Sequence, residues 1–276
     1  MITIALLLAY FLSNQLLNTT GIQRELLVYT PPVLEPLVLN VSKMFEQKYN
    51  VKVLVSSGPT GSLISKIEAT RMGDVLITAD HFFMEKAINK GLVDAESVRS
   101  ISIVIPAIIL NKNTSLEITS LKDLTYRNLT IGIADPEVAP FGRLAVAILV
   151  HNEIFDVLRD RIQIFPEVRD VVRQLRFGSI DVGILPHVVK YWYPVELDII
   201  WIKPEELGNS VSCQLAGVVK FARDKEIALL FISELVEYVK GLDIDQYGYV
   251  TTPEDLDRIS LYKYTDVIQW SAICRY

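Results

Sequence analysis

Residues 129–149 carry the pattern that most directly suggests chemistry. A β-rich run is followed by a loop broken by Pro136, Pro140 and Gly142, and then at once by an apolar segment with helical spacing. This order brings the unpaired N–H groups of a helix N-terminus to the carboxyl end of a strand. Such a position binds anions, because the first turn has spare donors and a partial charge of about +0.5. The segment therefore predicts an anion site built from main-chain amides.

Three further turns have the same design and follow Pro32, Gly61 and Glu167. Burying a dianion without compensation is very costly, and four helix N-termini at about half a charge each would roughly balance it. An N–H donor cannot accept an acidic proton. We therefore expect such a site to prefer a fully ionised tetrahedral dianion to hydrogen phosphate.

To place these turns together, the chain must alternate strands and helices. β-Rich runs at residues 25–29, 51–56 and 74–78 alternate with amphipathic segments at 33–49, 62–72 and 81–89. A second block has strands at 129–133, 162–165 and 180–185, with helices that begin at Phe141 and Val168. Apolar runs of this length, joined by helices, indicate parallel sheets covered on both faces.

The run 101–110 contains Pro106, which is disfavoured in a central strand, so we expect a bend or crossover there. Strands at 199–202 and 213–220 and a helix at 225–240 form the return path. The pattern predicts an α/β fold of two lobes joined by two crossovers. Lobe I would comprise residues 22–103 plus 205–249, and lobe II residues 104–204, followed by a C-terminal extension at 250–276. Ligands in such folds lie in the cleft that faces the carboxyl ends of the strands.

The composition limits the class of function. Half of the 276 residues are hydrophobic and 22% are charged, which indicates a globular rather than a disordered chain. The net charge of -6 disfavours a nucleic-acid partner. We find no nucleophile elbow, paired acid and base, or metal-ligand spacing, so neither an enzyme nor a cofactor or metal-cation site is expected.

The N-terminus suggests export. Residues 2–12 form an apolar run whose length suits a signal-peptide core better than a membrane span, although Arg24 is the first positive charge. We expect residues 1–21 to be an export signal or an anchor, the alternative being a buried helix, and the protein to act in the periplasm or on the outer face of the membrane. Sequons at Asn18, Asn40, Asn113 and Asn128 agree with export.

The chain has two cysteines, Cys213 and Cys274, which lie far apart in the sequence. In an exported protein they could form one disulfide. Two unpaired, buried thiols are the alternative.

Four patches in a shared order resemble the molybdate- and tungstate-binding proteins of ABC importers, and the likeness runs from about Leu26 to Tyr249. They are Ser56-Ser-Gly-Pro-Thr-Gly-Ser-Leu63, Gly73-Asp-Val-Leu-Ile-Thr-Ala-Asp80, Ala134-Asp-Pro-Glu-Val-Ala-Pro-Phe-Gly-Arg143, and Glu167-Val-Arg-Asp-Val-Val172 with Asp181-Val-Gly-Ile184. The resemblance implies a periplasmic-binding-protein type II fold that captures an oxyanion and delivers it to a membrane permease. We expect the protein to be a monomer.

The family holds its oxyanion with two loop hydroxyls, backbone amides and a tyrosine hydroxyl. Carried onto this sequence, one loop hydroxyl falls on Thr60, with Gly61 in the same turn, and the amides fall on Phe141 and Val168. Side-chain identity matters little at the last two positions, because the N–H is the donor.

Two positions depart from the family pattern. The first-loop serine aligns with Val33, although Thr30 offers a hydroxyl nearby, and the tyrosine aligns with Pro186, which has neither a phenol nor an N–H. His187 follows and is the candidate replacement donor. These departures leave the exact anion open.

The leading interpretation is the substrate-binding subunit of an ABC importer for molybdate or tungstate. The alternatives are a binding protein for sulfate or another oxyanion, an enzyme on the same fold, and the sensing domain of a regulator. Beside the site, Arg143 is expected to form a structural ion pair rather than an anion contact. We expect Asp135 to organise neighbouring amides, and residues 191–193 to pack on the lobe surface.

Overall fold

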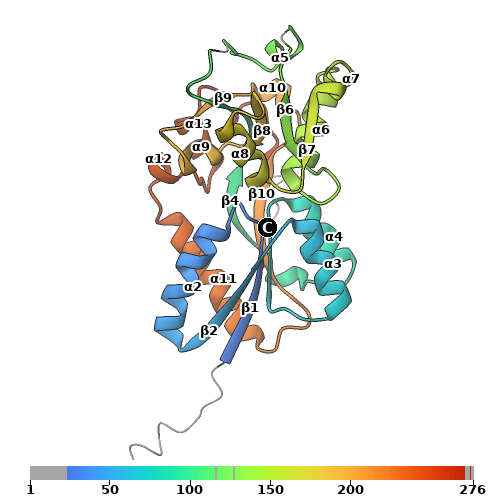
Figure 1. Ribbon diagram of the computed structural model, residues 1–276. Helices are drawn as coiled ribbons and strands as arrows, with labels where there is room; N and C mark the ends of the chain where they lie inside the picture. Colours follow the sequence, from blue (N-terminus) through green and yellow to red (C-terminus); the bar gives the residue numbers. More distant parts are fainter. Residues whose placement is uncertain (1–23, 116, 127, 271–273, 275–276) are drawn as a thin grey trace, which may run out of the picture.

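The computed structural model describes residues 24–115, 117–126, 128–270 and 274, which fold around two five-stranded sheets (Figure 1). We call the sheet that contains β1 and its helices the first lobe, and the other sheet with its helices the second lobe. The predicted signal or anchor at residues 1–21 lies outside the described residues. No helix in the described part of the chain is long and apolar enough to cross a membrane.

The first sheet has the strand order β2-β1-β3-β10-β4. Helices α2 and α11 lie on one side of this sheet and α3 and α4 on the other (Figure 1). Helix α11 buries an apolar stripe that includes Phe231 and Leu235, and its N-terminus is capped by Asp224, which accepts a hydrogen bond from the amide of Ile227. The elements are β1 (Arg24–Thr30), α2 (Glu35–Tyr49), β2 (Val51–Ser57), α3 (Thr60–Thr70), β3 (Val75–Thr78), α4 (His81–Asn89), η1 (Ala95–Ser97), β4 (Arg99–Val104), β10 (Ser212–Val218) and α11 (Lys225–Lys240).

The second sheet has the order β7-β6-β8-β5-β9. Helices α6 and α8 pack against its central strands. Its elements are β5 (Pro106–Asn111), α5 (Asp123–Tyr126), β6 (Ile131–Ala134), α6 (Pro140–His151), α7 (Phe155–Leu158), η2 (Arg159–Arg161), β7 (Ile162–Phe165), α8 (Val168–Phe177), β8 (Val182–Pro186), α9 (Val189–Trp192), β9 (Leu197–Trp201) and α10 (Pro204–Leu207). The two-lobed α/β class predicted from the sequence is confirmed, and the lobe limits between the strands stay a prediction.

The prediction of parallel sheets is wrong for one strand in each sheet. β10 is antiparallel to β3 and β4, and β5 is antiparallel to β8 and β9. The reason is the route of the chain between the sheets. A single residue, Ile105, separates β4 from β5, so the predicted crossover at Pro106 is confirmed. A strand that arrives through a crossover enters its sheet at the cleft and runs away from it, opposite to the strands whose carboxyl ends face the cleft.

In each lobe, an aspartate that directly precedes a strand hydrogen-bonds the main chain of the neighbouring strand or of the residue just before it. Asp74, which is buried, accepts a hydrogen bond from the amide of Leu27 (2.7 Å) and donates its own N–H to the Leu27 carbonyl (2.9 Å). Asp181 makes the same reciprocal pair with Thr130 (2.7 and 3.0 Å). The two lobes therefore share the same reciprocal hydrogen-bond pair between an aspartate and the main chain.

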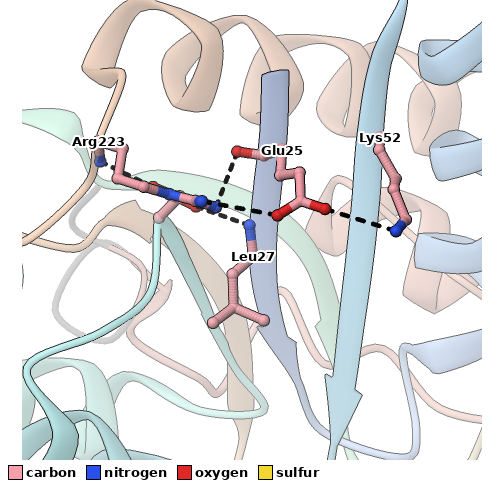
Figure 2. Close-up of polar contacts among 5 residues, drawn as sticks. Glu25, Leu27, Lys52 and Arg223 are labelled. Atoms are coloured by element: carbon pink, nitrogen blue, oxygen red, sulfur yellow. Dashed lines mark hydrogen bonds and ion pairs between the residues drawn. The ribbon is translucent and has the colours of Figure 1, made fainter. Parts of the chain in front are cut away.

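In the first lobe, ion pairs surround the hydrogen bonds between Asp74 and Leu27. Figure 2 shows the carboxylate of Glu25 between Arg223 and Lys52, next to the main chain of Leu27. Arg223 also contacts Asp74, at 3.2 Å. These charges fix the end of the sheet that is remote from the cleft.

The C-terminal extension packs onto both lobes. After α12 (Ile244–Tyr247), Val250 pairs with Ile103 of β4, and α13 (Pro253–Ile259) follows. The hydroxyl of Tyr264 donates to the Ile202 carbonyl at 2.7 Å, at the second crossover. Cys274 and Cys213 of β10 form a disulfide with a Cα–Cα separation of 5.5 Å, which decides between the two alternatives left by the sequence.

Candidate functional site

A small closed cavity lies between the lobes, at the carboxyl ends of the strands. Its volume is about 20 Å³, and it is lined by residues 31–33, 59–60, 79, 139–141 and 167–168. Each of these segments follows a strand, so loops of both sheets meet at one point. A cavity needs about 10–15 Å³ to hold one water. The cavity therefore has room for one or two water-sized groups.

The helices that begin at this cavity have no side-chain caps. Among the described helices of nine or more residues, α4 and α11 are capped by Asp80 and Asp224, whereas α2, α3, α6 and α8 have no side-chain cap. The lining of the first loop ends at Val33, two residues before α2, so the first turns that border the cavity are those of α3, α6 and α8. Their unshared N–H groups and partial positive charges thus converge on one enclosed space.

Main-chain amides of the second lobe provide free donors. In α6, Pro140 has no N–H, and the amide of Phe141 has no acceptor among the described residues. In α8, the same holds for the amide of Val168, while Asp170 and Val171 donate to the Glu167 carbonyl. The structure brings Phe141 and Val168 together at the cavity, as the sequence predicts.

The first lobe supplies one free side-chain donor. Thr60 is the first residue of α3, lines the cavity and is fully buried, and its hydroxyl has no hydrogen-bond partner. An unpartnered buried hydroxyl is costly, so its presence at a cavity indicates a missing partner. The neighbouring Gly61 is engaged differently, because its amide donates to the Val138 carbonyl of the second lobe at 3.0 Å.

The first-loop residues line the cavity with apolar groups. Val33 borders it, and its carbonyl accepts a hydrogen bond from Tyr249 at 2.5 Å. Thr30 is buried beneath the loop and donates its hydroxyl to the Pro31 carbonyl at 3.3 Å, so it does not replace the missing serine in this form. Four prolines (Pro31, Pro32, Pro59 and Pro140) also line the cavity, and none of them has an N–H to donate.

The side chain of His187 contacts the first crossover, at Ile105, and does not line the cavity. Its Nδ1 accepts the N–H of Ile105 at 3.1 Å, and its Nε2 lies 2.8 Å from the Gly248 carbonyl. Nδ1 is therefore the acceptor nitrogen and Nε2 carries the proton. Burial lowers the pKa of His187 to about 4. Since both ring nitrogens are occupied and the ring does not line the cavity, the geometry does not support the expected donor role.

The other residues singled out from the sequence have structural partners. Asp135 accepts the amide of Glu137 at 2.9 Å, which agrees with its expected role in the loop. Arg143 forms an ion pair, as expected, with Asp80 at 2.6 Å. This pair joins the lobes. Asp80 lies just before α4, and no local sequence pattern indicates that it pairs with Arg143.

Residues 191–193 line a larger groove of about 590 Å³ between α2 and α8, outside the closed cavity. Its three arginines, Arg169, Arg173 and Arg176, each form an ion pair with a carboxylate. Arg176 lies 3.9 Å from the ring centre of Tyr193 and forms an ion pair with Glu196 at 2.7 Å. In the described part of the chain, no group of three His, Cys, Asp or Glu side chains could hold a metal ion.

A family model described as "Bacterial extracellular solute-binding protein" matches residues 26–237. The chain belongs to this family. Among its solute-binding relatives, the molybdate-binding protein ModA of Rhodobacter capsulatus is 22% identical over 219 residues, covering 76% of this chain and 82% of the relative.

Solved structures of solute-binding proteins have the same type II fold. The periplasmic molybdate-binding protein of Azotobacter vinelandii is 22% identical, with a TM-score of 0.70, covering 82% of this chain and 99% of that one. The periplasmic binding protein AfuA of Actinobacillus pleuropneumoniae, solved with fructose-6-phosphate, is 20% identical, with a TM-score of 0.69, covering 92% and 99%. At these identities the structures establish the fold, and their ligands differ in size and chemistry.

Proposed function

We propose that this protein captures molybdate or tungstate in the interlobe cavity and presents the ion to the membrane permease of an ABC importer. The observation that carries the proposal is the convergence of the uncapped N-termini of α3, α6 and α8 on one cavity. Free amides at Phe141 and Val168 and the unpartnered hydroxyl of Thr60 point to an anion with several acceptor oxygens. The molybdate-binding relatives agree with it.

The size of the cavity supports an inorganic ion over an organic solute. A space of about 20 Å³ cannot hold a sugar phosphate in this closed form. The same small volume favours sulfate as the second candidate, because sulfate is a smaller tetrahedral dianion. Hydrogen phosphate is disfavoured, since its acidic proton would face N–H donors.

The proposed location follows from the family, and the net charge bears on the choice of partner. An extracellular solute-binding protein meets its permease outside the cytoplasmic membrane, so the protein would be exported and act there. The net charge of -6 gives no support to a nucleic-acid partner.

Competition calorimetry with molybdate, tungstate, sulfate and phosphate tests the choice of ion. We expect one of the first three to bind tightly and to raise the melting temperature by mass action, because the ligand binds the folded form. No binding of any of these ions at millimolar concentration would refute an oxyanion-binding function. Tight sulfate binding with weak molybdate binding would favour the second candidate.

Thr60→Val tests the site itself. The substitution replaces the hydroxyl by a methyl group of similar shape, so it removes one hydrogen bond to a charged ligand and should weaken affinity about tenfold or more. Thr70→Val is the matched control, because Thr70 lies at the other end of α3 and its hydroxyl donates a hydrogen bond to the Lys66 carbonyl. Equal affinities for both variants would remove Thr60 from the site.

A further inference from the structure

Two arginines of the second lobe reach carboxylates of the first lobe on opposite flanks of the cavity. Arg143 of α6 contacts Asp80 at the start of α4, on the flank where α3, α4 and α6 lie (Figure 1). Arg169 of α8 contacts Glu35 of α2 on the other flank. On the Arg143 flank, the hydrogen bond from Gly61 to the Val138 carbonyl also crosses between the lobes.

The two ion pairs differ in how much they depend on the lobes being closed. Arg169 has a second carboxylate within its own lobe, Glu167 at 3.1 Å, and its side chain is 46% exposed. It can therefore keep a partner when the lobes separate. Arg143 has no second carboxylate among the described residues, so separation would leave it without an ion-pair partner.

Asp80 depends on closure even more strongly. Its side chain is 0% exposed, Oδ1 accepts the amide of Phe83 at 3.0 Å, and Oδ2 accepts the Arg143 guanidinium at 2.6 Å. The guanidinium also lies 4.5 Å from the ring centre of Phe82. A buried carboxylate needs its cation, since removing one partner of such a pair leaves an uncompensated charge. The pair therefore joins a desolvated group of one lobe to a partner that only the other lobe supplies.

We infer that Arg143 and Asp80 are positioning residues that hold the lobes closed, and that they control how fast the captured ion leaves without touching it. Neither side chain lines the cavity. Their contribution is made in the closed state and is lost on opening, so it should appear in the dissociation rate and not in the association rate. The effect on ion release rests on the proposed function, whereas the effect on lobe closure does not.

Asp80→Asn and Arg143→Met test this inference. Asparagine caps a helix as well as aspartate does, so Asp80→Asn should keep α4 intact while it removes the charge. Arg173→Met is the matched control, because Arg173 pairs with Asp170 within α8 (2.7 Å) and not across the lobes. Far-UV circular dichroism and melting curves establish that each variant is folded.

Stopped-flow release of the ion found by calorimetry should be about tenfold faster in each of the two test variants and unchanged in Arg173→Met. The double variant should release no faster than either single variant, because both substitutions remove the same pair. Multiplied effects in the double variant, or equal acceleration by Arg173→Met, would overturn the inference.

Small-angle X-ray scattering of the ligand-free proteins provides a readout that needs no ion. We expect a larger radius of gyration for both test variants than for the wild type and Arg173→Met. A wild type that is already as expanded as the variants would overturn the inference. If the wild type binds none of the ions but the scattering differs as expected, the proposed function fails and the role of the pair in closure stands.

Discussion

Gly142 provides the sharpest test of how the site is built. It lies in the first turn of α6, directly after Phe141, where the helix approaches the end of β6. A Cβ atom at this position would lie 2.1 Å from the Ala134 carbonyl oxygen and 2.8 Å from the carbonyl carbon of Asp135. Both neighbours are backbone, so neither can rotate away. Gly142→Ala must push the start of α6 outward by roughly 1 Å to relieve such a contact.

This displacement predicts two effects of different origin. Overpacking of this kind lowers the free energy of unfolding by about 1–3 kcal/mol. The shift also moves the Phe141 amide, and N–H···O bonds occupy a narrow range of about 2.7–3.2 Å, so that donor should be lost to the ligand. A hydrogen bond to a charged group contributes about 1.5–3 kcal/mol, which corresponds to at least a tenfold loss of affinity.

Urea unfolding and calorimetry measure the two effects separately. Gly241→Ala is the control, since its Cβ would meet only ordinary contacts, the nearest being the Glu237 carbonyl oxygen at 3.6 Å. We expect the control to retain both stability and affinity. Wild-type affinity in a folded Gly142→Ala protein would refute the assignment of the Phe141 amide as a ligand donor.

Two further predictions concern the regions that join the lobes. Cys274→Ser removes the disulfide, which links residues 61 positions apart, and should lower the free energy of unfolding by up to about 4 kcal/mol. Urea unfolding without reductant measures the change. An unchanged unfolding midpoint would contradict the disulfide. His187 has a folded-state pKa of about 4, below its unfolded value near 6.5, so the unfolded chain binds more protons between these values and stability falls as the pH drops through this window. The loss should approach about 3 kcal/mol and be absent in His187→Gln, whereas equal pH dependence of the two proteins would show that His187 is not buried as a neutral ring.

The elements could be predicted from the sequence because their boundaries are local. The helices at 81–89 and 225–240 and the strand at 162–165 end where glycines, capping aspartates and apolar periodicity indicate. The direction of β5 and β10 could not be read in this way. Pairing direction depends on which sheet the chain has just left, and no local pattern records that route.

In the candidate site, too, local features could be predicted and long-range contacts could not. Thr60, Phe141 and Val168 were predicted because each belongs to a short strand–turn–helix segment, and the structure places all three at one cavity. His187 was expected there as well, but the orientation of its ring depends on Ile105 and Gly248, which are distant in the sequence. The Arg143–Asp80 pair likewise joins residues 63 positions apart. Such contacts follow from the assembled fold, and sequence periodicity carries no information on them.

The prolines around the cavity have a consequence for the thermodynamics of capture. Pro31, Pro32, Pro59 and Pro140 restrict the backbone of three of the loops that line the cavity. Loops that are already rigid lose little conformational freedom when a guest arrives, so the entropic penalty of binding arises mainly from the motion of whole lobes. Binding and release of the ligand should therefore occur on the slow timescale of hinge bending between the lobes rather than on the fast timescale of surface-loop motion.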